Sequence, residues 1–168
     1  LKKLAGMGIP ADEGNMYTTP IATIDYIKKN FPNVKKLFML GTPSMIGQFE
    51  KAGFISCTDD PDDVPDMLIV AFDTTLVYSR LCRATWWAKQ GIPYMATNPD
   101  WVCPTDARTI LVDCGSLQKC IEAASGRRPD KVMGKPDPTM LDGIRDRNGL
   151  RADEIAMVGD RIYTDIAM

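Results

Sequence analysis

Histidine is absent from this chain of 168 residues. Its absence excludes Ser-His-Asp triads, Cys-His dyads, histidine metal ligands and phosphohistidine chemistry together. Any acid or base catalysis would therefore have to come from Asp, Glu, Lys, Tyr or Cys side chains.

The chain also lacks paired cysteine motifs. Its five cysteines are odd in number and no two are spaced as CxxC, which fits neither a zinc site nor a disulfide framework. None is followed six positions later by the arginine that a cysteine phosphatase uses in its phosphate-binding loop. We therefore expect reduced, partly buried thiols in a cytoplasmic protein. The cysteines are Cys57, Cys82, Cys103, Cys114 and Cys120.

Long apolar runs and an excess of one charge are missing as well. No apolar run approaches the roughly 18 residues of a membrane span, and the opening LKKLAGMGIP has no apolar signal core or cleavage site. The 20 Lys and Arg against 22 Asp and Glu leave no net field that would favour nucleic acid or an anionic membrane. We expect neither as a partner. The first residue is not Met, so we do not expect it to be the natural start.

The residues that are present alternate between strand and helix patterns. Continuous apolar runs predict strands buried on both faces, and amphipathic segments ending in glycine predict the helices between them. Such alternation is typical of an α/β fold with a mostly parallel sheet. The predicted strands are 16–19, 35–40, 67–72, 93–97, 109–112, 131–134 and 154–159, and the predicted helices are 19–30, 43–53, 78–91, 116–126 and 138–149.

Two strand ends near the C-terminus carry charged side chains suited to a phosphate. In VMGKPDP a strand ends at Gly134 and Lys135, and in MVGDRIYTD another ends at Gly159 and Asp160. Ligands of open α/β sheets collect where strands end, so neighbouring parallel strands would bring Lys135 and Asp160 to one edge. Each motif alone is equally typical of a turn or a helix cap, but the two in order favour a site.

The spacing of these residues suits a magnesium site. Mg²⁺ takes one or two carboxylates plus phosphate oxygens and keeps several waters. We predict that Asp160 ligates Mg²⁺ and that Asp165 orients the loop or a bound water. Lys135 would place its positive charge on the same phosphate.

These motifs resemble motifs three and four of the haloacid dehalogenase (HAD) superfamily, and the closer match is its NagD-like, p-nitrophenyl-phosphatase branch. The resemblance covers nearly the whole chain, because YTTPIATIDYI, EKAGF, LIVAFDTTLVYSRL, GIPYMATNPD, GSLQKCIEAASGRRPDKVMGKP and MVGDRIYTDI follow in that branch's order. It implies a Rossmann-like core, present in part, with a large inserted α/β cap. Residues 1–30 and 132–168 would be parts of the core, and 31–131 the cap.

The resemblance also implies a phosphatase mechanism that this chain does not complete. Members use an aspartate nucleophile that forms an aspartyl-phosphate, with a second aspartate as general acid and base, and both help to bind Mg²⁺. That DxDG motif and the second motif, a TN loop that binds phosphate, would precede residue 1. We therefore expect an internal fragment of a Mg²⁺-dependent phosphatase of small phosphorylated metabolites. The alternative is a non-catalytic binding or structural module.

One other interpretation keeps the reacting groups within the chain. LIVAFDTTLVYS superficially resembles the first motif, with Asp73 as nucleophile after a buried strand and Thr97 as the second motif. Lys135 and Asp160 would then follow in the correct order. Position 75 is Thr where a carboxylate is expected, however, and the branch resemblance assigns both stretches to the cap. This interpretation is the weaker one.

The resemblance further implies that loops of the cap contact the leaving group of the substrate. TNPDWVC (97–103) is the candidate loop, and Cys103 lies where some members have a substrate-contacting His. We predict Cys103 and Asn98 as substrate contacts, with turn formation as the alternative for Asn98. Trp86 and Trp87 are expected to pack within the helix layer. The expected partners are a small phosphorylated metabolite and a second copy of the chain, bound through the cap.

Overall fold

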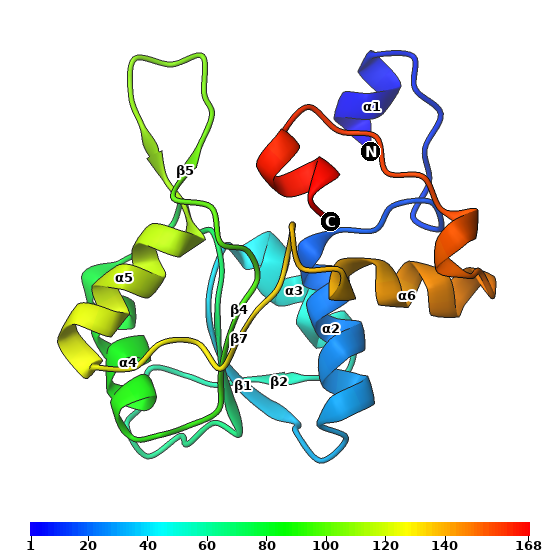
Figure 1. Cartoon of the computed structure of the whole chain (residues 1–168). Helices are drawn as coiled ribbons and strands as arrows, with labels where there is room; N and C mark the ends of the chain where they lie inside the picture. The colour runs from blue at the N-terminus through cyan, green and yellow to red at the C-terminus, as the bar shows by residue number, and fades with distance from the viewer.

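A five-stranded parallel sheet forms the centre of the structure (Figure 1). The computed structural model describes residues 1–168 apart from the side chain of Tyr163. The strand order is β2-β1-β3-β4-β7, and every pairing in this sheet is parallel, which confirms the predicted α/β class. The strands are β1 Lys36–Leu40, β2 Ile55–Ser56, β3 Met67–Val70, β4 Tyr94–Ala96 and β7 Lys131–Val132.

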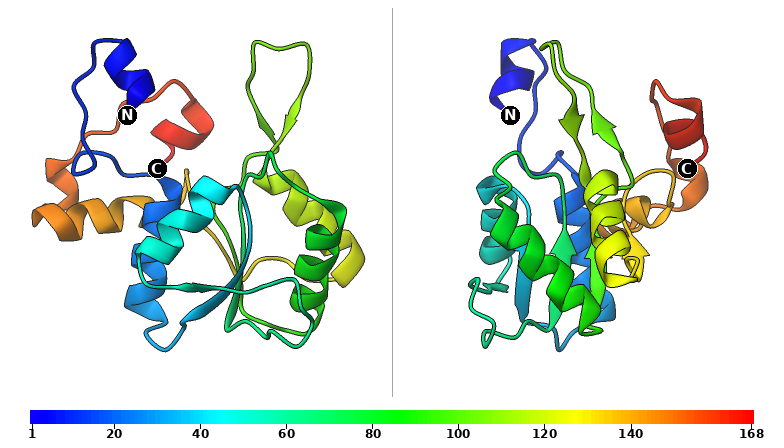
Figure 2. Two further views of the ribbon diagram at one scale, coloured as in Figure 1. Left: turned by 180° about the vertical axis from the view of Figure 1, so that it is seen from behind. Right: turned by 90° about the vertical axis from the view of Figure 1, so that its left-hand side faces the viewer.

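Helices cover both faces of this sheet (Figures 1 and 2). Successive side chains of a strand point to opposite faces, so Leu37 and Met39 of β1 enter one hydrophobic cluster and Phe38 and Leu40 enter the other. The first cluster is closed by α2 (Thr19–Asn30) and α3 (Pro43–Lys51), and the second by α4 (Tyr78–Lys89) and α5 (Cys114–Ser125). This double burial explains the continuous apolar runs of the strands.

Local sequence signals account for where the helices begin and end. Pro20 occupies the first turn of α2, where its missing N–H costs no hydrogen bond. The hydroxyl of Thr42 accepts a hydrogen bond of 3.3 Å from the backbone N–H of Met45 and so caps α3. Gly126 ends α5 at φ 77°, a left-handed conformation that glycine adopts without strain. Trp87 of α4 is buried, as predicted, whereas Trp86 is 48% exposed.

A short antiparallel hairpin extends away from the main sheet (Figure 2). It consists of β5 (Val102–Cys103) and β6 (Leu111–Val112), with Val102 opposite Val112. The strand predicted at 109–112 therefore exists in part, but it belongs to this hairpin. The hairpin follows directly on the loop that leaves β4.

The remaining elements lie on the side of the molecule where α2 is (Figure 1). They are α1 (Lys2–Gly6), α6 (Thr139–Asn148), the 3-10 helix η1 (Ala152–Glu154) and the π-helix η2 (Ile162–Ile166). Among them α6 packs against α2. Two ion pairs join α6 to α2, from Arg147 to Asp25 at 2.9 Å and from Lys29 to Asp146 at 2.8 Å. The predicted domain boundaries at 30/31 and 131/132 stay predictions; α2 and β7 both pack with the main sheet.

Two predicted strands are wrong. Residues 154–159 contain no strand: Val158 is 90% exposed, and the chain there passes from η1 into irregular structure. Residues 16–19 are also irregular up to the start of α2. An apolar run becomes a strand only beside a neighbour that accepts its backbone hydrogen bonds, and neither segment has one among the described residues. The two-residue strand β2 was not predicted, because it is too short to show a period.

The described helices are all too short or too polar to cross a membrane.

Replacing Ile27 of α2 with Ala should lower the free energy of unfolding by about 2–5 kcal/mol, because its fully buried side chain fills the first cluster. Urea denaturation measures this change. The matched control is Ile110→Ala in the hairpin, where the side chain is 72% exposed and the expected loss is within about 0.5 kcal/mol. Equal losses in the two variants would contradict the packing of α2 against the sheet.

Candidate active site

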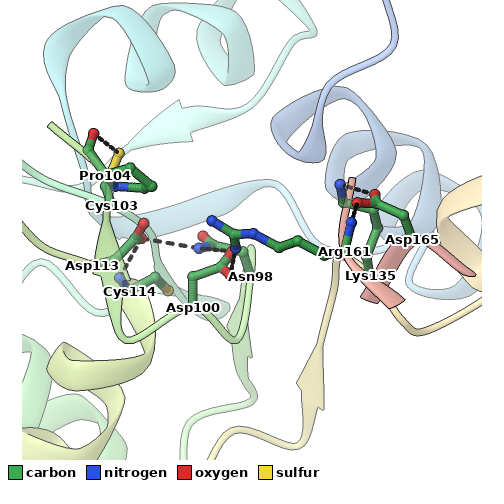
Figure 3. A network of polar contacts seen from close by, with 9 residues as sticks. All are labelled: Asn98, Asp100, Cys103, Pro104, Asp113, Cys114, Lys135, Arg161 and Asp165. Atoms are coloured by element: carbon green, nitrogen blue, oxygen red, sulfur yellow. Dashed lines mark hydrogen bonds and ion pairs between the residues drawn. The ribbon is translucent and has the colours of Figure 1, made fainter. Parts of the chain in front are cut away.

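The structure brings Lys135 and Asp165 together although 30 residues separate them in the chain (Figure 3). Lys135 follows β7, and Asp165 lies in the π-helix η2. The ammonium Nζ of Lys135 forms an ion pair with Oδ1 of Asp165. The carboxylate of Asp165 is buried, whereas the side chain of Lys135 is 42% exposed. The lysine therefore keeps part of its positive charge available to a ligand.

Gly159 allows this carboxylate to lie against the backbone. A Cβ atom added at Gly159 would lie 2.2 Å from both Cβ and Cγ of Asp165. This is too close for any residue with a side chain. The backbone N–H of Arg161 also donates a 3.2 Å hydrogen bond to Oδ2 of Asp165. The glycine of the GDR stretch is thus needed for the close approach of the loop to Asp165.

These contacts hold the pKa of Asp165 below its ordinary value. The hydrogen bond from Lys135 is the largest cause, and it is opposed by desolvation of the carboxylate. The backbone N–H of Arg161 and the side chain of Asp160 add to the lowering. Asp165 therefore carries its negative charge throughout the neutral pH range.

Asp160 is exposed at the start of the same loop. Within the part of the chain that the structure describes, no three His, Cys, Asp or Glu side chains are grouped so that they could hold a metal ion. Mg²⁺ needs fewer protein ligands, because it binds through one or two carboxylates and fills its other positions with phosphate oxygens and water. Asp160 and Asp165 lie in one short segment and offer carboxylates of the type that such a partial donor set requires.

Asn98 is held within the protein by its own side chain. Its amide nitrogen donates to Oδ2 of Asp100 at 3.2 Å and to Oδ1 of Asp113 at 2.9 Å, and its amide oxygen accepts from the Thr97 hydroxyl at 3.0 Å (Figure 3). Asp113, for which the sequence predicted no role, also caps α5 by accepting from the backbone N–H of Cys114 at 2.6 Å. The structure thus shows a loop-organising role for Asn98, and its substrate contact stays a prediction.

The structure does not bring Cys103 to the Lys135–Asp165 pair. Cys103 lies in β5, with its thiol directed to the carbonyl oxygen of Pro104 at 3.7 Å, and Figure 3 shows it well apart from Lys135. Its predicted contact with a substrate stays a prediction.

Arg161 is a site residue that the sequence did not single out. Its guanidinium Nη1 lies 3.5 Å from Oδ1 of Asp100, which joins the loop of Asp160 to the loop after β4. The only sequence feature that could have pointed to Arg161 as a site residue was its position directly after Asp160. Its partner could not be predicted, because the pair spans 61 residues between two irregular segments.

Asp73 lies at the carboxyl end of β3 in a turn of its own. Its Oδ1 accepts hydrogen bonds from the backbone N–H of Thr75 at 2.8 Å and from the Thr75 hydroxyl at 2.7 Å. The side chain is buried, at 8% exposure. This carboxylate stabilises the turn after β3, which agrees with the weaker standing of Asp73 as a nucleophile.

Comparisons with known proteins give a consistent picture. Residues 132–168 match a family model described as HAD-hydrolase-like. An acid sugar phosphatase of Staphylococcus epidermidis is 31% identical over 165 residues, which cover 98% of this chain and 61% of that protein. The ribonucleotide monophosphatase NagD of Escherichia coli K12 is 30% identical over 164 residues, with the same coverage. The chain thus spans about three fifths of the length of these relatives.

Solved structures agree with this relationship. The 4-nitrophenylphosphatase of Thermotoga maritima is 36% identical, with a TM-score of 0.88 over 99% of this chain and 61% of that one. A glycerol phosphate phosphatase of Mycobacterium tuberculosis, solved in complex with calcium, is 26% identical, with a TM-score of 0.86 over 98% of this chain and 48% of that one. The chain is thus similar over nearly its whole length to known phosphatases, and its C-terminal part matches the HAD-hydrolase-like family. These similarities support the resemblance of its motifs to the NagD-like, p-nitrophenyl-phosphatase branch of that superfamily.

Replacing Lys135 with Met should raise the pKa of Asp165 toward its ordinary value, because the largest cause of its lowering is removed. Carboxyl ¹³C NMR over a pH series measures this shift. Since the folded pKa of Asp165 is depressed, its stabilising contribution is present above the unfolded pKa and is lost as pH falls through the folded pKa. The variant should therefore lose less stability than the unmodified protein over that acidic range.

The control for this titration is Lys131→Met. Lys131 lies four residues away and pairs with Asp137 at 2.5 Å, so its removal should leave the Asp165 titration unchanged. An Asp165 pKa that is the same with and without Lys135 would contradict the ion pair.

Proposed function

We propose that this chain is part of a Mg²⁺-dependent phosphatase that hydrolyses small phosphorylated metabolites. The observation that carries the proposal is the ion pair of Lys135 with the buried Asp165, which joins the GKP and GDR motifs at one site. The phosphatase names of the relatives support the same reaction class. The chain spans about three fifths of the length of these relatives, and the proposed aspartate nucleophile, which would form an aspartyl-phosphate, would lie outside this chain.

Lys135 is the proposed phosphate-binding residue. Its ammonium is held in place by Asp165, and its side chain as a whole is 42% exposed. A fixed positive charge beside the transferring phosphate stabilises the negative charge of the transition state without reorganisation. Asp165 positions this lysine, and the close contact with Gly159 keeps Asp165 from turning away.

Asp160 is the proposed metal ligand, with Asp165 in support. The exposed carboxylate of Asp160 lies on the loop that also carries Asp165, the partner of Lys135, so a cation bound there would lie on the same side of the protein as this lysine. When bound, Mg²⁺ would offset the charge of the phosphate oxygens. A relative solved with calcium supports a divalent cation for this branch.

The cap contributes the remaining proposals. Cys103 and Asn98 would face the leaving group of the substrate, and a homodimer would form through the cap. The five cysteines are all free, which fits a cytoplasmic protein.

The decisive variant is Asp160→Asn in the full-length protein. It should lower kcat for p-nitrophenyl phosphate by at least about 100-fold and raise the Mg²⁺ concentration needed, since even outer partners of a bound metal are worth 10–100-fold. Steady-state kinetics at a series of Mg²⁺ concentrations measure both. Hydrolysis by Asp160→Asn at the unmodified rate would remove Asp160 from the mechanism.

The matched control is Asp153→Asn. Asp153 is an exposed carboxylate whose ion-pair partner is Arg151, at 2.8 Å, and not Lys135. This variant should leave kcat and the Mg²⁺ dependence unchanged. No hydrolysis by the unmodified full-length protein would instead favour the alternative of a non-catalytic module.

A further inference from the structure

The loop after β4, residues 97–103, is fixed firmly to the start of α5. Three hydrogen bonds tie its backbone carbonyls: Gly115 N–H to Asp100 at 2.7 Å, Asp113 N–H to Trp101 at 3.0 Å, and the Ser116 hydroxyl to Trp101 at 2.7 Å. A Cβ atom added at Gly115 would lie 2.3 Å from the Pro99 carbonyl oxygen. This loop is therefore a rigid part of the fold, which we call the cap loop.

The cap loop presents one oriented carboxylate. Oδ2 of Asp100 accepts from the Asn98 amide at 3.2 Å, and Asn98 is itself held by Asp113 at 2.9 Å. The other oxygen, Oδ1, faces the guanidinium of Arg161 at 3.5 Å (Figure 3). Because its position is set from behind by Asn98, Asp100 offers Arg161 a preorganised partner.

Arg161 connects this carboxylate to the proposed metal loop, residues 159–165. It follows Asp160 in the chain, and its backbone N–H donates to Oδ2 of Asp165 at 3.2 Å. One residue thus uses its amide to hold the partner of Lys135 and its guanidinium to hold the cap loop. A displacement of Asp100 relative to Arg161 would act directly on the loop that carries Asp160.

The turn that carries Lys135 rests on the same cap loop. A Cβ atom added at Gly134 would lie 3.2 Å from Cα of Asn98 and 3.2 Å from the carbonyl oxygen of Thr97. Gly134 is also at φ 93°, a conformation that other residues rarely adopt. The cap loop therefore touches both halves of the site, the lysine turn by packing and the metal loop by an ion pair.

We propose that the Asp100–Arg161 ion pair is a latch that couples the cap loop to the metal loop, and that Asp100 is thereby a positioning residue for the phosphatase reaction. The catalytic part of this inference rests on the proposed function. The latch holds the metal loop against the cap loop. It thereby keeps the position of Asp160 relative to Lys135 fixed. Both partners are about one third exposed, at 35% and 38%, so the latch is weak enough to open during turnover.

The test is a double-mutant cycle with Asp100→Asn and Arg161→Gln, read by hydrogen exchange of the backbone amides. Asn keeps the shape of Asp100 and removes its charge. Each single variant should speed exchange about 2–5-fold in both 97–103 and 159–165, after correction for intrinsic rates, because partly exposed ion pairs contribute little. The double variant should exchange no faster than the singles, because both changes break the same contact.

The matched control is Arg127→Gln, which removes the ion pair of Arg127 with Asp130. The side chain of Arg127 is 33% exposed, close to the 35% of Arg161. This variant should leave exchange in both loops unchanged. Effects that add in the double variant, or that stay within the segment of the substituted residue, would overturn the latch.

Kinetics of the full-length protein separate the latch from the proposed function. Asp100→Asn should lower kcat/KM for p-nitrophenyl phosphate about 2–5-fold and raise the Mg²⁺ requirement, although Asp100 lies outside the proposed ligand set. Arg161→Lys, which keeps the charge, should lose less than Arg161→Gln. Coupled exchange without any hydrolysis by the unmodified protein would support the latch and remove the proposed function. Normal hydrolysis by the unmodified protein with uncoupled exchange would support the proposed function and overturn the latch.

Discussion

The parallel pairing of β4 with β7 is the constraint on which the site depends. Met95 lies opposite Lys131 and Ala96 opposite Val132, so the two strands end at the same edge of the sheet. From that edge one strand continues into the cap loop and the other into the turn of Lys135. The strand pairing alone therefore places the cap loop next to the turn of Lys135, although the two are distant in the chain. Contacts between their side chains only refine this arrangement.

The elements that the sequence predicted well are those whose burial is decided locally. The runs at 67–70 and 94–96 are buried on both faces, and the helices that flank them carry a cap, an early proline or a final glycine. The run at 154–159 looks equally apolar, yet Val158 lies exposed. Apolarity supplies the tendency to be buried, but pairing depends on a neighbouring strand, which a local pattern does not contain.

Several carboxylates show the same limit at the level of single side chains. Asp73, Asp113 and Asp165 all follow motif-like stretches, and all are buried. Asp73 stabilises a turn and Asp113 caps a helix, whereas Asp165 alone holds a lysine. Sequence motifs singled out Lys135 and Asp165 separately, but the expected meeting of Lys135 with Asp160 depended on a strand at 154–159 that does not form, and the ion pair of Lys135 with Asp165 was not predicted. Sequence spacing could not identify Asp100 and Arg161, whose meeting depends on how two irregular segments are oriented in space.

The firm attachment of the cap loop has a consequence for how this protein can diversify. The hairpin tip at 104–110 is exposed throughout and lies beyond the last hydrogen bonds that fix the loop to α5. Insertions and deletions at such a tip disturb neither the sheet edge nor the contacts of Asn98 and Asp100. A longer or shorter tip would thus change the exposed surface of the hairpin while the segments beneath it keep their positions.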